Sequence, residues 1–538
     1  MVRNKNTTPL SRVQASLPLL KEIKKITCSA SISWGVIHEG QILLTHAEGL
    51  RDVRQNLPAN TDTAYLLASL TKAFISALCG LLVEERLLDW DTPISDYVPL
   101  QMTIDPEGGK RITMRDALSH STGRAHMDLT WLGVEAETIV EKEDLLHVIS
   151  HLPLKYDVRA GFHYNNYMYA VIGKVIEIAS SSNNLGTKTW SDHLRDRIFM
   201  PLSMQRSATN RDALQDHNLA EGHMVLDDKS LRTTAPTDMS DRTTIGPAGA
   251  VWSTVPDMLK WAKALLEGMT AGDNGENACL PHLQTVMSPK IAVEASIQED
   301  TYAMGWIRAL LPSKGLGFIS NNGLQRDHVL GSESRPRQLL YHNGGQSGYL
   351  SAMYLFPETR SAIVAMANSY GLGDAPDWTA HIIAEALFDL EPKRDYVALA
   401  TARAEYQYNF YGSLKQEYYS RQQKGTVQPP GTDFCGTFKN DGFLMTLQVT
   451  SGTVETSASL LDLVVNNRPR QHHQLRHFHY DVWGFLPASR EEYQLREFID
   501  WRNWEQFVLR FQRDAAGRVI SLLWRLQEDV EPILFVKA

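Results

Sequence analysis

The alternation of apolar and polar positions changes several times along the chain, and each change predicts a different element. Residues Ser29 to Gly49 alternate in two runs separated by Glu39-Gly40, which predicts a β-hairpin. Before it, Leu17 to Ile26 carries apolar residues three positions apart, as in an amphipathic helix. After Tyr65 the spacing is that of a largely buried helix, which ends before Asp89.

The central region mixes predicted helices and strands. Helices are predicted at Tyr167 to Ser180 and Val255 to Glu267, and strands at Leu339 to His342, Ser351 to Phe356 and Ser361 to Met366. Strands near both ends of a region with helices between them predict an α+β fold whose sheet collects N- and C-terminal strands. The long polar stretch Thr209 to Ile245 is predicted to be a loop over a site.

The pattern of apolar and polar residues changes again in the last third of the chain. Residues Trp378 to Gln422 are predicted to be helical, and Gln423 to Gly431 has the composition of a linker. Beyond it, short alternating runs separated by turns predict a small all-β barrel or sandwich; they are Leu444 to Val449, Thr453 to Ala458, Leu460 to Val465, His477 to Phe485, Trp504 to Phe511 and Val519 to Arg525. We therefore predict a large domain at 1–390, a helical connector and linker at 391–431, and a barrel at 432–538.

Composition and charge narrow the partners. The 538 residues are 43% hydrophobic and 21% charged, close to the globular average, and the net charge of -9 comes from mixed acidic and basic residues. Without a basic stripe, we expect no nucleic acid partner. Four cysteines, none in a C-x-x-C, suit a reducing compartment. The polar N-terminus and the short apolar run Ala73 to Val83 predict a cytoplasmic protein that does not bind a membrane.

The first group of candidate catalytic residues is Ser69-Leu70-Thr71-Lys72, at the start of the buried helix. Side chains at i and i+3 lie on one face of a helix, so Lys72 is expected to reach the Ser69 hydroxyl. A serine is a poor nucleophile until a neighbour takes its proton, and a lysine takes one only where burial or nearby cations lower its pKa. The alternative is a serine at a helix start beside a lysine in solvent.

Two further motifs follow at predicted element boundaries. Tyr164-Asn165-Asn166 precedes an apolar helix, and His342-Asn343-Gly344-Gly345 ends a short strand. A tyrosine can relay protons, an asparagine can hydrogen-bond a substrate carbonyl or amide, and glycines allow a backbone N–H to approach an acyl carbon. Taken singly, Tyr164 and Asn166 also fit a packed residue and a helix cap, and His342 fits a core histidine.

In this order the three motifs resemble the serine β-lactamase and penicillin-binding-protein superfamily, in its class C β-lactamase, D-aminopeptidase and family VIII esterase branch. The resemblance covers about Leu17 to Leu390 and extends to further segments: Asp62 to Tyr65, Leu87 to Asp91, Ile112 to Gly123, Pro201 to Met204, Pro247 to Thr254 and Met304 to Trp306. It implies an antiparallel sheet flanked by helices with a helical subdomain. The segment from Phe434 resembles the lipocalin-like barrel appended to some members.

The resemblance also implies roles for the motif residues. Ser69 would be the acylated nucleophile, Lys72 its proton partner and Tyr164 the general acid or base. The N–H groups of Ser69 and Gly345 would form the oxyanion hole. Asn166, His342 and Gly344 would lie on the substrate side.

His342 departs from the pattern, because many members carry lysine at this position. A lysine is a permanent cation that binds carboxylates, whereas an imidazole is mostly neutral near pH 7. Esters, thioesters or neutral amides are therefore expected in place of carboxylate-bearing substrates.

A histidine cluster in the C-terminal region invites a metal interpretation. It consists of His472, His473, His477, His479 and Asp481, of which 477, 479 and 481 share one face of a strand. No complementary ligand spacing occurs elsewhere, so neither a metal nor a cofactor is expected.

The sequence thus predicts a serine hydrolase or acyltransferase that forms an acyl-serine with a small-molecule substrate, in secondary metabolism. The acceptor is water or an alcohol or amine, and D-amino-acid amidase or β-lactamase activity remains an alternative. A catalytically idle ligand-binding scaffold is the alternative from another class. The sequence says nothing of oligomeric state.

Overall fold

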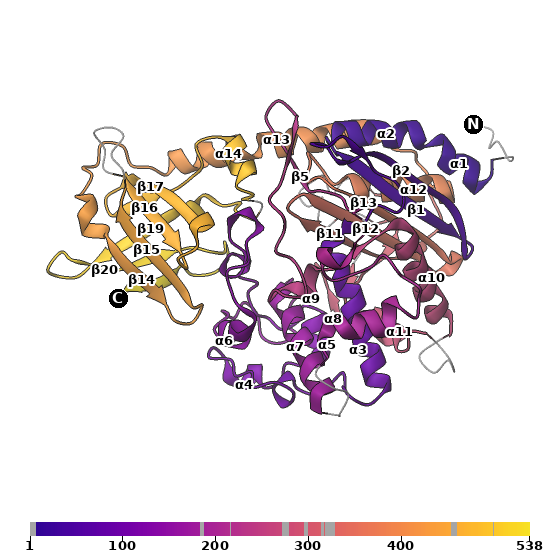
Figure 1. Cartoon of the computed structure of the whole chain (residues 1–538), viewed down its shortest axis with the longest axis horizontal. Coiled ribbons are helices and arrows are strands. Elements are labelled where there is room, and N and C mark those ends of the chain that lie inside the picture. The colour runs from indigo at the N-terminus through magenta and orange to yellow at the C-terminus, as the bar shows by residue number, and fades with distance from the viewer. Residues whose placement is uncertain are drawn as a thin grey trace. The chain divides into compact units, whose positions relative to one another are not determined.

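The computed structural model describes residues 7–182, 188–215, 217–271, 279–294, 300–313, 317, 329–452, 460–498 and 500–538. The chain forms two compact units (Figure 1). The first, here called the sheet unit, comprises Met1–Pro99, Glu107–Gly123 and Tyr156–Gln407. The second, the barrel unit, comprises Leu100–Pro106, Arg124–Lys155 and Tyr408–Ala538. The domain boundaries predicted from the sequence, after residues 390 and 431, stay a prediction.

A nine-stranded antiparallel sheet forms the centre of the sheet unit. Its strands, in spatial order, are β3 (Leu57–Pro58), β2 (Gln41–Asp52), β1 (Ser31–His38), β13 (Ser361–Ala367), β12 (Tyr349–Phe356), β11 (Arg337–Gln346), β10 (Ile307–Leu311), β9 (Thr301–Tyr302) and β8 (Ile291–Ala292). The predicted N-terminal hairpin and the three predicted central strands are all present. N- and C-terminal strands meet where β1 pairs with β13, so the predicted α+β class is confirmed.

Helices cover both faces of this sheet (Figure 1). Helices α1 (Pro9–Ala15), α2 (Leu17–Ile26) and α12 (Ala375–Phe388) lie on one face, where Trp34 and Val36 join their apolar core. Helix α10 (Val255–Ala271) packs on the other face against β1 and β13. Gly35 permits this packing, because a Cβ there would lie 2.7 Å from the Val255 side chain.

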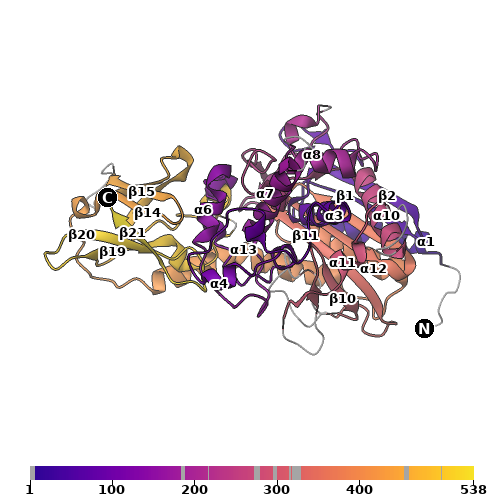
Figure 2. The same ribbon diagram turned by 90° about the horizontal axis from the view of Figure 1, so that it is seen from below.

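A helical subdomain completes the sheet unit. Helices α3, α5, α7, α8 and α9 contact one another in it, and α3, α7 and α8 are seen from below in Figure 2. The bounds of these and the remaining helices of the unit are α3 (Thr71–Glu84), α4 (Pro106–Gly109, whose first residue belongs to the barrel unit), α5 (Met114–Leu118), α7 (Asn166–Ser182), α8 (Trp190–Leu194), α9 (Gly246–Gly249) and α11 (Leu283–Met287). The sheet unit also contains two short strand pairs, β4 (Tyr65–Leu66) with β7 (Trp252–Ser253) and β5 (His223–Val225) with β6 (Leu231–Thr233). The last pair lies within the stretch predicted to be a loop.

The barrel unit contains a closed barrel whose eight strands follow sequence order, as in lipocalins. They are β14 (Gly436–Asn440), β15 (Met445–Ser451), β16 (Leu461–Val465), β17 (His472–His479), β18 (Val482–Gly484), β19 (Val508–Arg513), β20 (Val519–Trp524) and β21 (Ile533–Lys537). The run His477 to Phe485 contains the end of β17, a turn and β18, and Trp504 to Phe511 begins as a 3-10 helix. The predicted strand Thr453 to Ala458 lies outside the described residues.

Residues 124–155, here called the strap, belong to the barrel unit although they interrupt the sheet unit in sequence. The strap includes helix α6 (Leu145–Ser150), drawn in purple in Figure 1. Gln471 accepts a hydrogen bond from the Val134 N–H (2.9 Å) and donates to the Val134 carbonyl (3.1 Å) and to Glu137 (2.8 Å). Gln527 accepts from the Met127 N–H at 2.9 Å. Polar side chains of the C-terminal region thus hold the strap.

The region predicted to be helical from Trp378 to Gln422 consists of two helices. Helix α12 ends at Phe388, its C-cap Asp389 has φ of +52°, and α13 (Tyr396–Ser420) begins after a short turn. The barrel unit also contains α14 (Arg490–Leu495). Within the described residues, every helix is too short or too polar to cross a bilayer.

Candidate active site

Ser69 lies in a tight turn that leads into a buried helix. The turn is a 3-10 helix, Ala68–Leu70, and α3 follows it directly. Ala68 has φ of +47°, a left-handed conformation that is costly for a residue with a Cβ. Ser69 is partly exposed, while Ala68 and Leu70 on either side of it are buried. The backbone therefore presents the hydroxyl at an opening in a buried region.

Lys72 follows one turn later and is fully buried. Its Nζ lies 3.0 Å from the Ser69 Oγ and donates to the Ala248 carbonyl at 2.9 Å. Gly305 lets another segment approach here, because a Cβ on it would lie 2.9 Å from the Lys72 carbonyl. The alternative of a lysine in solvent is therefore wrong, and the predicted contact between the two side chains is present.

Tyr164 lies next to Lys72. The Lys72 Nζ is 4.8 Å from the centre of the Tyr164 ring and 5.4 Å from that of Tyr169. Helix α7 starts at Asn166, and its cap is Asn165, whose Oδ1 accepts from the Met168 N–H at 3.3 Å. The interpretation of Asn166 as the cap is therefore wrong by one residue, and Asn166 stays a predicted substrate contact.

His120 holds the segment that carries Tyr164. Its carbonyl accepts from the His163 N–H (2.9 Å), its Nδ1 accepts from the Asn165 N–H (3.0 Å), and its ring centre lies 4.2 Å from that of Tyr164. Burial first, and then the charge of Lys72, lower the pKa of His120 well below its ordinary value. Both residues that flank Tyr164 in sequence are thus tied to a buried neutral histidine.

The predicted residue His342 lies in β11 and is fully buried. Its Nδ1 lies 2.6 Å from the Asn343 carbonyl, so Nδ1 carries the proton and donates it. Nε2 then accepts from the Tyr302 hydroxyl at 3.0 Å. Burial, followed by the charge of Lys72, lowers the pKa of His342 to about 3. The imidazole is therefore neutral and engaged at both nitrogens.

A buried carboxylate of helix α12 binds strand β11 at the residue after His342. Asp377 in α12 is fully buried, and its Oδ1 accepts from Asn343 Nδ2 and from the Tyr354 hydroxyl, both at 2.8 Å. His381 Nε2 lies 2.9 Å from the same hydroxyl. This network joins helix α12 to β11 and β12 at Asn343, the residue that follows His342.

Gly344 and Gly345 differ in their surroundings. A Cβ on Gly344 would lie 2.1 Å from the Leu67 carbonyl, so only glycine lets β11 approach the turn before Ser69. Ser351 of β12 reinforces this approach by donating to the same carbonyl at 2.7 Å. Gly345 is exposed, whereas its neighbours in β11 are buried.

Three residues of this region were not identified from the sequence. Ala248 and Tyr302 lie within or beside segments that carry the family resemblance, Pro247 to Thr254 and Met304 to Trp306, and that proximity was the available signal. Asp377 has no such signal, because an aspartate in the first turn of a helix is ordinarily a stabilising surface residue.

The histidine cluster of the C-terminal region is dispersed. His472 pairs with Asp462 at 3.0 Å, and His473 packs against the rings of Phe485 and Trp501. The other two histidines contact backbone groups, His477 that of Tyr480 and His479 that of Gln423. In the part of the chain that the structure describes, no three His, Cys, Asp or Glu side chains are grouped as metal ligands.

Comparison with curated proteins finds several similar chains. Unguisins hydrolase ungD from Aspergillus violaceofuscus is 27% identical over 60% of this chain and 56% of its own length. The match to unguisins hydrolase ungD' from Aspergillus campestris spans 54% of that protein, so the chain covers only about half of these relatives. Human mitochondrial serine beta-lactamase-like protein LACTB is 23% identical over 64% of this chain and 72% of its own length.

Solved structures share the fold. The octameric penicillin-binding protein homologue from Pyrococcus abyssi aligns with a TM-score of 0.56 at 18% identity, over 97% of this chain and 99% of that one. A class C beta lactamase from Rhodobacter sphaeroides aligns with a TM-score of 0.51 at 18% identity, over 74% of this chain and 98% of that one. The model of the family described as Beta-lactamase matches residues 22–387, which is more than half of the chain. The chain therefore belongs to the Beta-lactamase family of serine β-lactamase-like proteins.

Proposed function

We propose that the protein is a serine hydrolase that cleaves an ester, thioester or neutral amide bond of a small molecule through an acyl-Ser69 intermediate. The observation that carries the proposal is the buried Lys72 Nζ at 3.0 Å from the Ser69 Oγ. An amine is expensive to bury, and proton transfer from the serine is a function that accounts for its place beside the Ser69 hydroxyl.

In the proposed acylation, Lys72 acts as the base. A neutral amine has two N–H groups and one lone pair. With one N–H donated to the Ala248 carbonyl, the lone pair can accept the proton of the Ser69 hydroxyl. The Oγ then attacks the substrate carbonyl carbon, and a tetrahedral intermediate forms with negative charge on the carbonyl oxygen.

Two backbone N–H groups are assigned to that oxygen, those of Ser69 and Gly345. The assignment is supported by the close approach of Gly344 to Leu67, which draws β11 toward the turn that holds Ser69, and by the exposure of Gly345. Tyr164, whose ring faces Lys72, is assigned to protonate the leaving group and later to activate the incoming acceptor. Loss of the leaving group completes acyl-Ser69.

The electrostatics of the site support a substrate without a carboxylate. His342 and His120 are both neutral because burial lowers their pKa values. The position where many relatives carry lysine therefore supplies no positive charge, and both nitrogens of His342 are engaged within the protein.

Water is the acceptor we propose, which makes the protein a hydrolase and not an acyltransferase. The name of the unguisins hydrolases, which are similar over 60% and 58% of this chain, supports this choice. An alcohol or amine acceptor would use the same acyl-Ser69, so the two activities differ only in the second step.

Labelling with a fluorophosphonate probe followed by peptide mapping tests the proposal. We expect modification of the peptide that contains Ser69 and no labelling of Ser69→Ala. A panel of p-nitrophenyl esters, thioesters and D-amino-acid amides, with and without an alcohol acceptor, then distinguishes hydrolysis from transfer. A wild-type protein that neither reacts with the probe nor hydrolyses p-nitrophenyl butyrate would instead be a binding scaffold.

A further inference from the structure

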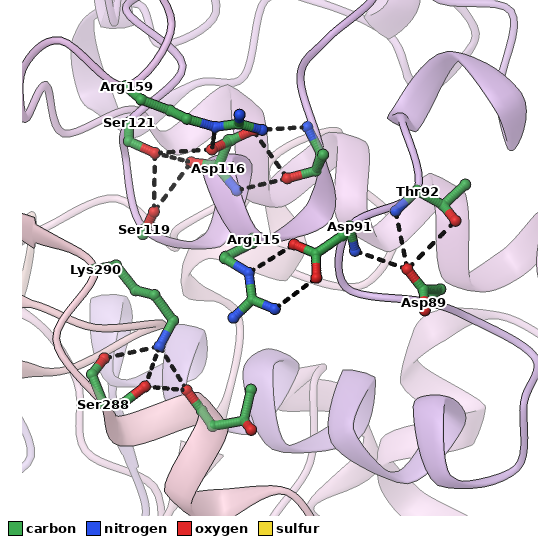
Figure 3. Close-up of polar contacts among 12 residues, drawn as sticks. Asp89, Asp91, Thr92, Arg115, Asp116, Ser119, Ser121, Arg159, Ser288 and Lys290 are labelled. Carbon is green, nitrogen blue, oxygen red and sulfur yellow. Dashed lines mark hydrogen bonds and ion pairs between the residues drawn. The ribbon is translucent and has the colours of Figure 1, made fainter.

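Helix α5 carries two arginine–aspartate pairs of almost the same geometry but different surroundings (Figure 3). Arg159 donates to Asp116 through Nε at 2.8 Å and Nη2 at 2.9 Å. Arg115 donates to Asp91 through the same two atoms at 2.8 and 2.9 Å. The carboxylate of the first pair is 4% exposed and that of the second 68% exposed. The first pair is therefore the one with a fixed, desolvated anchor.

The anchor is part of the helix cap. Thr113 is the N-cap of α5, and its N–H and hydroxyl donate to Asp116 Oδ2 at 3.0 and 2.8 Å. The Asp116 N–H returns a hydrogen bond to the Thr113 hydroxyl at 3.3 Å. Such a capping box fixes a carboxylate in one orientation, so Arg159 binds to a rigid group.

Arg159 lies in the segment that leads to Tyr164. Its own backbone is in the left-handed region, with φ of +70°, which costs about 1 kcal/mol for a residue with a Cβ. Its N–H donates to the Ser121 carbonyl at 2.7 Å, next to His120. The bidentate pair with Asp116 offsets the cost of this conformation.

A change at Arg159 would reach Tyr164 through His120. The His163 and Asn165 N–H groups both donate to His120, on either side of Tyr164 in sequence. Tyr164 in turn faces Lys72, whose contact with Ser69 lies within one helical turn. Release of the segment at Arg159 would thus move Tyr164 but leave the contact between Lys72 and Ser69 in place.

We infer that Arg159 and Asp116 are positioning residues that hold Tyr164 in register with Lys72 and Ser69. This inference rests on the proposed function for its catalytic consequence. The inference gives the ion pair between Arg159 and Asp116 of α5 a role in the reaction. Neither side chain is among the predicted site residues. The second pair, Arg115 with Asp91, joins α5 to the turn after α3 and supplies a control of matched geometry.

The experiment compares Arg159→Met, Arg159→Lys and Arg115→Met in the full chain. The rate of Ser69 labelling by the fluorophosphonate probe should fall about 10-fold in Arg159→Met, because a displaced catalytic group loses about this much or more, and less than twofold in Arg115→Met. KM for p-nitrophenyl butyrate should stay within twofold while kcat falls. Arg159→Lys, which keeps the charge and one donor, should recover part of the loss.

Hydrogen exchange provides a readout that does not depend on activity. The amides of His163 and Asn165 should exchange about 10-fold faster in Arg159→Met and at the wild-type rate in Arg115→Met. Equal effects of the two methionine variants, or unchanged exchange at these amides, would overturn the inference. Absence of labelling in the wild type would count against the proposed function instead, and the exchange comparison would still decide whether Arg159 holds the segment.

Discussion

In the sheet unit, Lys72, His342 and Asp377 are completely buried around one helix start and one strand, whereas the interior of the barrel is lined by apolar side chains such as Phe438, Leu447, Trp483 and Phe535. Burying an ionisable group costs several kcal/mol that an apolar group of similar size would not. A fold selected for stability alone would resemble the barrel. The buried polar groups of the sheet unit therefore mark the region where chemistry is expected.

The barrel unit also buries polar side chains, but these have a different use. Gln471 and Gln527 are nearly inaccessible, and their amides bond to backbone groups of the strap. They satisfy a loop-rich segment that has few partners of its own, which is a structural role. The comparison teaches that burial of a polar group alone does not identify a site; Lys72 differs from these glutamines because it lies 3.0 Å from a serine hydroxyl.

The largest effect that would test this division is expected from Lys72→Met. Removal of the base should lower the rate of Ser69 labelling about 1,000-fold. The free energy of unfolding should stay within about 1 kcal/mol or rise, because a buried amine is replaced by an apolar chain of similar length. Labelling kinetics and urea unfolding check both parts, and Lys263→Met, an exposed lysine of α10, serves as the control. A large loss of stability in Lys72→Met would show that the amine serves the fold.

The next effect concerns the support beneath β11. Asp377→Ala leaves the Asn343 amide and the Tyr354 hydroxyl without their shared acceptor and should lower the free energy of unfolding by about 3 kcal/mol. Asp377→Asn keeps an acceptor oxygen and should lose less. Urea unfolding monitored by circular dichroism gives both values, with Glu267→Ala on the exposed face of α10 as a control within about 0.5 kcal/mol. Equal losses in the two Asp377 variants would mean that the charge itself matters.

A smaller effect is expected from pH. The pKa of His342 is lowered from 6.5 to about 3 in the folded protein, so between these values the unfolded chain binds a proton that the folded chain does not. The stability contributed by neutral His342 is complete above pH 6.5 and is lost at about 1.4 kcal/mol per pH unit as the pH falls toward 3. Between pH 7 and pH 5 the wild type should therefore lose about 2 kcal/mol more than His342→Gln. Urea unfolding at the two pH values measures this difference, and a parallel decline of both proteins would contradict it.

The smallest effect is expected in the barrel unit. Gln471→Ala removes three hydrogen bonds to the strap and should lower the free energy of unfolding by about 1 to 2 kcal/mol, with faster exchange of the Val134 amide. Gln474→Ala, three residues further along in β17 and less buried, should change it by about 0.5 kcal/mol or less. Ser69 labelling should stay within twofold in both variants. A slower reaction in Gln471→Ala would break the division between the two units.

Much of the geometry of the candidate site was predictable from local pattern. The spacing of Ser69 and Lys72 placed their side chains on one helical turn, and the observed contact of 3.0 Å follows from that geometry. Tyr164 and His342 were predicted from motif order, and both lie in the same aromatic cluster, with ring centres 6.2 Å apart. The boundaries were less predictable, since one apolar run in the barrel contains a turn and the helical stretch after residue 378 contains a break.

By itself, the sequence determined the elements with clear periodicity, the motif residues and the family, because these depend on residues close together in the chain. The tertiary structure decided the states and partners of those residues. His342 is neutral and engaged at both nitrogens because Tyr302 and the Asn343 carbonyl surround it in a desolvated site. Asp377 lies beneath Asn343, and residues 124–155 belong to the barrel unit, through contacts between segments far apart in the chain. Burial and long-range hydrogen bonds set these features, and neither is encoded in a local pattern of apolar and polar positions.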